Sequence, residues 1–521
     1  MVRVDNDFGG FCTHSSILFL TWHRPYLAIF ETELYKHVNF IANAYTEDER
    51  KADYVKAAKT FRMPYWDWAR PDLGVFPPQA ASAALNKVVR PKALSGKSEI
   101  NPLSNYTFRE SASLRDINTV PRVGATVRYP NIRDGDAEIN RQLLAFFQGE
   151  QGSPKGKNLT ERISSFDPIF WLHHANIDRL FAIWQAIHDK PSDPLTYVTT
   201  KPSDANWGNF IVKAGDPEGI DTPLAPFAQS SNGTEQKFWT SEGVRTTEVF
   251  GYAYPETQKA RFPTPKDVIN ELDRLYGKMA TFANIMRSSS ADLDNATQEL
   301  QQRAKNHIKA ERGQLAAASV EQAPLAQTNG VHLPKERELK KLVGAENKYL
   351  EWLVNIKAEK AQLGGNYVVH VFLGDVDDAS PLLYPTQHSH VGVFATFGQN
   401  ENTACRNCQE GRARGQQITG QIPITLALVE RYLAGMVDSL APADVIPYLQ
   451  KNLHWRVALV NGEVQDRQNV GNLLVSVVTD EVTIPSNPSD LPVYAPDVVV
   501  RPDCTTNRQG SGRGHGTGYS G

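Results

Sequence analysis

The sequence predicts a mainly α N-terminal domain followed by a β-rich C-terminal domain. Two segments, residues 11–42 and 166–185, place apolar side chains at helical spacing, and both carry histidines on or beside the apolar stripe. From Asn366 onward, apolar and polar residues alternate as they do in an antiparallel sheet with one buried face. The length of 521 residues is sufficient for two to four domains with a sizeable core.

Composition excludes several classes of function. The net charge is −3 and no basic face stands out, so we expect no nucleic-acid partner. No apolar run approaches the roughly 18 residues of a membrane span, so we expect no membrane insertion. The N-terminus has no apolar signal-peptide core, and four cysteines are too few for a disulfide scaffold. These features predict a cytoplasmic protein, and they leave its oligomeric state open.

The first histidine segment covers residues 11–42. From about Ser16 it predicts one long helix, with His23 on the apolar stripe and His14 just before the helix, two residues after Cys12. His37 is next to a lysine, and we interpret it as a surface residue. The stripe itself consists of Leu27, Phe30, Leu34, Val38 and Ile41.

Between the two histidine segments lies FRMPYWDWAR, residues 61–70, whose aromatic density predicts a core-packing segment beneath a helical bundle. Residues 71–165 are rich in turn formers and contain no histidine. This stretch therefore offers no imidazole ligand for a metal.

The second histidine segment, FDPIFWLHHANIDRLFAIWQ, predicts a helix that begins at Asp167 and Pro168, because a capping carboxylate followed by proline suits a helix start. His174 lies on the apolar stripe, beside His173. Asp178 is one turn further on and is placed to orient an imidazole. A satisfied core histidine and a metal ligand are both compatible with this pattern. The stripe consists of Phe170, Ile177, Phe181 and Trp184.

The rest of the chain predicts connecting and shielding parts. Residues 190–257 are loop-like and end in a Tyr-x-Tyr motif, Tyr252 and Tyr254. The following polar, Ala- and Gln-rich stretch predicts exposed helix and linker. The predicted domains are an incomplete catalytic domain at 1–257, a helical linker at 258–362, a β-rich domain at 363–505 and a disordered tail at 506–521.

Two helices that each offer an inward histidine predict a metal held inside a helical bundle, and imidazole ligands suit copper or zinc. Residues 12–31 and 166–185 resemble the two copper-binding segments of fungal tyrosinases. PYWDWA, residues 64–69, resembles the aromatic segment between them, and the Tyr-x-Tyr motif resembles the end of the catalytic domain. The alternating region resembles the shielding domain of that family.

The resemblance implies a catalytic bundle around a dicopper site. In this family each copper is held by three histidines, and the pair binds O2, hydroxylates monophenols and oxidises o-diphenols to o-quinones, often for melanin-type pigment. By position, His14 and His23 match ligands of the first copper and His174 matches a ligand of the second. His173 is then a neighbour, because His174 alone lies on the apolar stripe. The implied partners are small phenols and O2.

The resemblance also implies roles for other residues. Cys12 matches a cysteine that forms a thioether with the histidine two positions on, which here is His14. Phe170, one turn before His174, is expected over the second copper, where it limits access. Cys405 and Cys408 match a C-x-x-C thought to help load copper, although the same spacing suits a redox pair or half of a zinc site.

In latent members an apolar side chain of the C-terminal domain plugs the active site. Phe394 and Phe397 are the candidates here. We therefore expect residues 366–500 to fold separately and to cover the mouth of the histidine cavity.

The sequence departs from the family in its ligand set. A third ligand of the first copper is expected upstream of Cys12, before Met1, and the His-x-x-x-His pair of the second copper is absent. No histidine occurs between His37 and His173. Three of six ligands remain, which predicts a poor or inactive oxidase. The alternatives are an oxidase restricted to diphenols or aminophenols, an inactive remnant, and an oxygen-binding protein like molluscan haemocyanin.

Overall fold

The computed structural model describes residues 11, 13, 16–45, 50–68, 70, 77–81, 88–89, 91, 98–99, 101–104, 106, 152–153, 157–158, 167–188, 217–230, 237–276, 281–318, 337–379, 381–396, 406–459 and 463–505. The chain divides into two compact units. Unit 1 comprises residues 1–143, 151–268 and 398–416, and unit 2 comprises residues 144–150, 269–397 and 417–521. Across the described ranges, no helix combines the length and apolar content that a membrane crossing needs.

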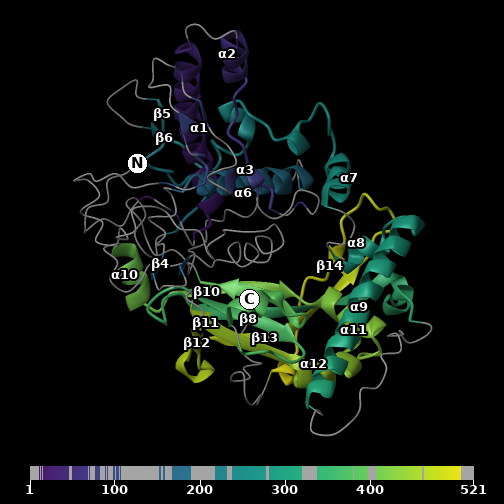
Figure 1. Ribbon diagram of the computed structural model, residues 1–521. Coiled ribbons are helices and arrows are strands. Elements are labelled where there is room, and N and C mark those ends of the chain that lie inside the picture. Colours follow the sequence, from purple (N-terminus) through teal and green to yellow (C-terminus); the bar gives the residue numbers. More distant parts are fainter. Residues whose placement is uncertain are drawn as a thin grey trace. The chain divides into compact units, whose positions relative to one another are not determined.

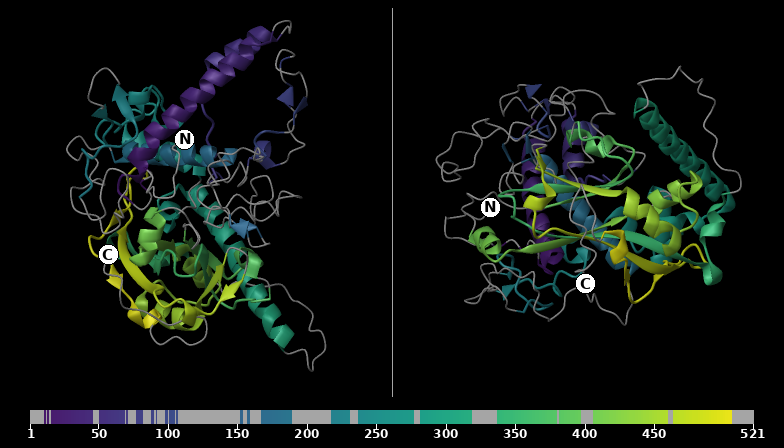
Figure 2. Two further views of the ribbon diagram at one scale, coloured as in Figure 1. Left: turned by 90° about the vertical axis from the view of Figure 1, so that its left-hand side faces the viewer. Right: turned by 90° about the horizontal axis from the view of Figure 1, so that it is seen from below.

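Unit 1 is organised around two helices that contact each other, α1 (Phe19–Asn43) and α6 (Pro168–Ile187). Figures 1 and 2 show α6 meeting α1 near the N-terminal end of α1. The predicted start of α6 is confirmed, because the Asp167 side chain accepts a hydrogen bond from the backbone N–H of Ile169 and Pro168 occupies the first turn. Between the helices, the rings of Phe30 and Trp171 stack with centroids 3.8 Å apart.

Helix α7 (Pro265–Tyr276) spans the boundary between unit 1 and unit 2. The remaining elements of unit 1 are short. They are α2 (Lys51–Lys59), α3 (Pro78–Ala81), α10 (Arg406–Ala413), the 3-10 helices η3 (Thr247–Phe250) and η4 (Pro255–Thr257), and three antiparallel strand pairs: β1 (Val88–Val89) with β2 (Ser98–Glu99), β3 (Gly152–Ser153) with β4 (Lys157–Asn158), and β5 (Ala228–Ser230) with β6 (Lys237–Phe238).

The stretch we predicted as loop-like contributes to the core of unit 1. Leu224, Phe227 and Val244 pack with Leu18 and Trp22 at the start of α1. The Trp22 indole also donates a hydrogen bond to the carbonyl of Ala225. The beginning of α1 is thus held by residues about 200 positions later in the chain.

The two predicted apolar stripes are only partly buried. On α1, Leu27 is 5% exposed whereas Ile41 is 42% exposed, and on α6 Phe181 is 4% exposed whereas Trp184 is 39% exposed. The first turns of α1 are covered by α6 and by residues 217–250, but its later turns contact the short α2. Periodicity predicts which side chains share a face, but not how far along a helix that face is covered.

Unit 2 contains two antiparallel sheets. One has the strand order β10–β7–β13–β14, with β15 also paired to β13, and the other has the order β12–β11–β8–β9. Their bounds are β7 (Lys348–Glu359), β8 (Tyr367–Leu373), β9 (His390–Ala395), β10 (Gln417–Pro423), β11 (Leu453–Leu459), β12 (Val464–Gln465), β13 (Leu474–Thr483), β14 (Val493–Tyr494) and β15 (Val499–Val500). This architecture confirms the predicted fold class, in which helices dominate the N-terminal part and strands the C-terminal part.

One apolar core joins the two sheets and includes Trp352 and Trp455, both fully buried. The helices of unit 2 are α8 (Phe282–Met286), α9 (Ser290–Ala318), α11 (Thr425–Leu433) and α12 (Pro442–Asn452), with the 3-10 helices η5 (Leu339–Leu342), η6 (Ala345–Asn347), η7 (Pro381–Thr386), η8 (Arg467–Asn469) and η9 (Pro502–Cys504). In Figure 1, α9 and α11 lie side by side next to the strands.

Phe394 belongs to this core rather than projecting from it. It is 9% exposed and packs against Gly420 on β10, where any β-carbon would lie 2.4 Å from the ring. The expectation that Phe394 reaches toward a histidine cavity is therefore wrong, since β9 turns its side chain into the core of unit 2. Phe397 lies outside the described residues.

The region we predict as a helical linker, 258–362, contains helices and, in addition, a strand. It holds α7, α8 and the 29-residue helix α9, and its last residues form β7, which pairs with both β10 and β13. Strand β7 escaped prediction because its sequence does not alternate strictly between apolar and polar residues, and the polar Glu351 and Asn355 are buried together with apolar neighbours.

Candidate metal centre

Two histidines from different helices of unit 1 lie face to face. His23 on α1 is 5% exposed and His174 on α6 is 7% exposed. Their ring centroids are 5.1 Å apart and the ring planes differ by 22°. The two rings therefore converge as their positions on the apolar stripes predicted, although 151 residues separate them in the sequence.

The tautomer of His23 follows from its hydrogen bond. Its Nδ1 lies 2.6 Å from the carbonyl oxygen of Phe19, one turn earlier in α1. A carbonyl oxygen can only accept, so Nδ1 carries the proton and the lone pair of the neutral ring is on Nε2. Metal-binding histidines commonly have this arrangement, in which a bond at one nitrogen orients the other toward the metal.

Aromatic side chains surround the histidine pair. The ring of Phe170 lies 4.3 Å from that of His174, and the ring of Phe19 lies 4.4 Å from that of His23. Phe170 is thus in contact with the predicted ligand, while its role in limiting access stays a prediction. Such a wall lowers the local polarity around the two imidazole rings.

His173 has different neighbours from His174. Its ring lies 6.4 Å from Trp68 of the aromatic segment, and its centroid is 5.7 Å from that of His174. Burial lowers the pKa of His173 to about 4, so this ring is neutral at physiological pH. Because His174 stacks on His23, it is His174 that occupies the centre between the two helices.

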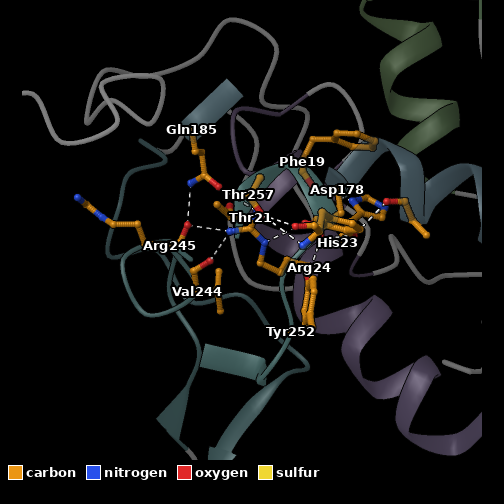
Figure 3. A network of polar contacts seen from close by, with 12 residues as sticks. Phe19, Thr21, His23, Arg24, Asp178, Gln185, Val244, Arg245, Tyr252 and Thr257 are labelled. Carbon is orange, nitrogen blue, oxygen red and sulfur yellow. Dashed lines mark hydrogen bonds and ion pairs between the residues drawn. The ribbon is translucent and has the colours of Figure 1, made fainter. Parts of the chain in front are cut away.

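Asp178 holds the two helices together through a buried network (Figure 3). Its Oδ1 accepts a hydrogen bond from Arg24 Nε at 2.8 Å, and the two side chains are 2% and 0% exposed. Arg24 also donates to the carbonyls of Val244 and Arg245 and to the Gln185 side chain. We expected Asp178 to orient an imidazole. That expectation is wrong, because its oxygens face the guanidinium and two tyrosines.

The Tyr-x-Tyr motif completes this network. The hydroxyls of Tyr252 and Tyr254 donate to Asp178 Oδ2 at 2.6 and 2.8 Å. Burial, together with the adjacent carboxylate, raises the pKa of both tyrosines above the ordinary value, so both stay protonated donors. The motif thereby ties the end of the segment 217–257 to the middle of α6.

A second buried ion cluster anchors the aromatic segment 61–70 to α6. Arg179 makes a bidentate pair with Glu256 at 2.7 and 3.0 Å, and its Nη1 lies 3.2 Å from Asp67. The guanidinium also stands over the ring of Tyr65, 4.7 Å from its centroid. Asp178 and Arg179 are consecutive residues of α6, so the two clusters hold the same turn of this helix, about one turn after His174.

Several predicted site residues lie outside the described residues, namely Cys12, His14 and Cys405. Cys408 falls within α10, but its side chain is also outside them. In the described part of the chain, no group of three or more His, Cys, Asp or Glu side chains could hold a metal. The geometry therefore brings together one imidazole from each of the two predicted copper segments.

Sequence reasoning missed Arg24, Arg179 and Glu256, and gave Tyr252 and Tyr254 no partner. A signal was present for the arginines. Each follows directly after a residue on an inward face, His23 or Asp178, within a helix whose neighbours are apolar. A charged residue at such a position needs a buried counter-ion, which sequence alone does not identify.

Comparison with known families identifies both parts of the chain. The pattern described as the common central domain of tyrosinase matches residues 2–145 and 156–187, and that of the tyrosinase C-terminal domain matches residues 351–477. A tyrosinase of Neurospora crassa is 32% identical over 613 aligned positions, covering 98% of this chain and 86% of that protein. A tyrosinase of Podospora anserina is 34% identical, and the alignment covers 84% of this chain and 83% of that protein.

Solved structures agree on the fold. A mushroom tyrosinase superposes with a TM-score of 0.61 at 22% identity, over 94% of this chain and 84% of that one. The holo-protyrosinase of Aspergillus oryzae superposes with a TM-score of 0.51 at 18% identity, over 93% and 82% of the two chains. At this level of identity, the likeness concerns the arrangement of the elements alone.

Proposed function

Because the chain belongs to the tyrosinase family of dicopper oxidases, we propose that it binds copper between α1 and α6 and oxidises small phenols. The observation that carries this proposal is the face-to-face placement of His23 and His174, whose buried rings lie 5.1 Å apart. The proposed reactions are hydroxylation of monophenols and oxidation of o-diphenols to o-quinones with O2, in the formation of a melanin-type pigment.

The residues fit a copper centre in their chemistry. Nε2 of His23 bears the lone pair because Nδ1 donates to Phe19, and imidazole nitrogen is a suitable ligand for copper. In the proposal, His14 and His23 hold the first copper and His174 the second. When bound, the copper pair supplies the two-electron oxidation of the phenol by O2.

The protein part of the proposed mechanism is positioning. The Arg24–Asp178 pair fixes α1 against α6, and thereby the distance between the two rings. The wall formed by Phe19 and Phe170 excludes water and presents aromatic faces that suit a phenolic ring.

A second candidate is a remnant with an incomplete site, and it has its own support. The 613 positions aligned with the Neurospora protein exceed the 521 residues of this chain, so that relative carries residues within the aligned region that this chain lacks. No histidine occurs between His37 and His173, where the family places a His-x-x-x-His pair for the second copper. We therefore expect slow turnover from this chain.

The test is to express the chain with copper, measure copper per chain, and assay oxidation of a monophenol and of an o-diphenol. A matched protein with the family's histidine segments restored serves as the reference. Slow, copper-dependent turnover by the chain that rises in the restored protein supports the proposal, whereas turnover by the restored protein alone favours the remnant. Turnover of o-diphenols alone favours a diphenol oxidase. Fast turnover by the unrestored chain would show that other residues supply the missing ligands.

A further inference from the structure

A buried carboxyl group outside the histidine pair holds the turn that precedes α1. Glu218 is 1% exposed, and its Oε2 accepts a hydrogen bond from Ser16 Oγ at 2.6 Å. Burial raises the pKa of Glu218, and the bond from Ser16 offsets part of that rise. A carboxylate has room for about four hydrogen bonds, and within the described residues this one receives a single bond, from Ser16. Burial of this carboxyl group therefore costs free energy. Its contribution to the structure is the hydrogen bond that it accepts from Ser16.

Ser16 in turn defines where α1 begins. Its Oγ accepts a hydrogen bond from the backbone N–H of Leu18 at 3.0 Å, and its carbonyl accepts one from the N–H of Phe19 at 3.1 Å. The Phe19 carbonyl is the group that accepts the hydrogen bond from His23 Nδ1. A chain of contacts thus runs from Glu218 through Ser16 and Phe19 to the ring of His23.

We propose that Glu218 is a positioning residue for the metal centre, because through Ser16 and the Phe19 carbonyl it sets the ring orientation and tautomer of His23. This inference rests on the proposed function in so far as His23 is a copper ligand. Glu218 does not touch His23 and acts only through the turn, although 202 residues separate it from Ser16.

A second hydrogen bond between the same two parts of the chain serves as a comparison. Thr21 Oγ1 and Ser241 Oγ are 2.8 Å apart, and both residues are buried. Like the Glu218 contact, this bond joins α1 to the segment 217–257. It acts, however, through Thr21, whose Oγ1 is also 3.2 Å from the Leu18 carbonyl, and it leaves the bond between Glu218 and Ser16 in place. Ser241→Ala is therefore a matched control for Glu218→Ala.

The first measurement needs no metal. In protein labelled with ¹⁵N-histidine, the Nδ1–H resonance of His23 is assigned by its loss in His23→Gln. We expect a slowly exchanging Nδ1–H in the wild type, in Glu218→Gln, whose amide oxygen still accepts from Ser16, and in Ser241→Ala. In Glu218→Ala the resonance should exchange at least about tenfold faster, because the turn is released.

The second measurement is a copper titration of the full chain. Loss of an orienting group typically weakens metal binding by about tenfold or more, which we expect for Glu218→Ala and not for Glu218→Gln or Ser241→Ala. Should Glu218→Ala not fold, Ser16→Ala removes the same hydrogen bond from the other side.

The inference is overturned if Glu218→Ala leaves the His23 resonance unchanged, or if Ser241→Ala alters it to the same extent. A wild-type chain that binds no copper contradicts the proposed function instead, and the resonance still decides the role of Glu218.

Discussion

The Arg24 guanidinium lies 2.8 Å from the Asp178 carboxylate, and this buried pair joins the two helices that carry His23 and His174. Both tyrosines of the Tyr-x-Tyr motif donate to the same carboxylate. A single acidic side chain thus makes hydrogen bonds to α1 and to the Tyr-x-Tyr motif, beside the stacking of Phe30 on Trp171 between the two helices.

We predict that Asp178→Ala destabilises the protein strongly. Removing one partner of a buried ion pair leaves the other charge uncompensated and typically costs about 3–5 kcal/mol. The measurement is the free energy of urea-induced unfolding. Glu33→Ala, which breaks the exposed pair between Glu33 and Lys36, is the control and should change the free energy very little. A loss below about 1 kcal/mol for Asp178→Ala would mean that the network is dispensable.

The adjacent histidines should differ in their effect on copper. His174→Gln removes the ring that stacks on His23, and we expect it to weaken copper binding by about tenfold or more. His173→Gln removes a ring whose neighbour is Trp68, and copper affinity should then stay within about twofold. Equilibrium copper titration of both variants checks this. Equal losses would show that the stacked ring is not the preferred ligand.

Two facing carboxyl groups should make the stability of unit 2 depend on pH. Glu351 on β7 and Asp480 on β13 are directly opposite, both are buried, and burial raises both pKa values, with the mutual repulsion adding to that of Glu351. A carboxyl group with a raised folded-state pKa binds more protons in the folded state above an unfolded pKa of about 4. Stability therefore falls as pH rises through that window.

Glu351→Gln removes the part of this dependence that comes from Glu351, while keeping an oxygen that can accept the hydrogen bond from Tyr494. The variant should have a higher Tm than the wild type at pH 7, and the difference should disappear toward pH 4. Thermal unfolding across that pH range is the measurement. A difference that persists unchanged at acid pH would contradict the assignment to the carboxyl pair.

His390 should produce the opposite trend. Burial, together with the neighbouring His370, lowers the pKa of His390 to about 3, and the nearest ring nitrogens are 3.3 Å apart. The unfolded chain binds more protons than the folded state between about pH 6.5 and that value, so stability falls on acidification through this window. In His390→Gln the decline below pH 6.5 should be shallower. An unchanged slope would exclude His390 as its source.

Local features of the chain were readable from sequence because their causes are local. Asp167 and Pro168 mark the start of α6 because capping needs only residues a few positions apart. His23 and His174 were recognisable because a polar ring within an apolar helical stripe stands out against its neighbours. The alternating pattern after Asn366 likewise predicted β8, β11 and β13.

The partners of these residues were decided only by the tertiary structure. Asp178 meets Arg24 instead of an imidazole, and Glu218 reaches Ser16 across 202 positions. Trp184 is exposed and Phe394 is buried, against expectation. Periodicity along a chain indicates which side chains share a face. Which counter-ion a charged residue meets, and which surface covers a face, depends on how distant segments pack. That information is not contained in any one stretch of sequence.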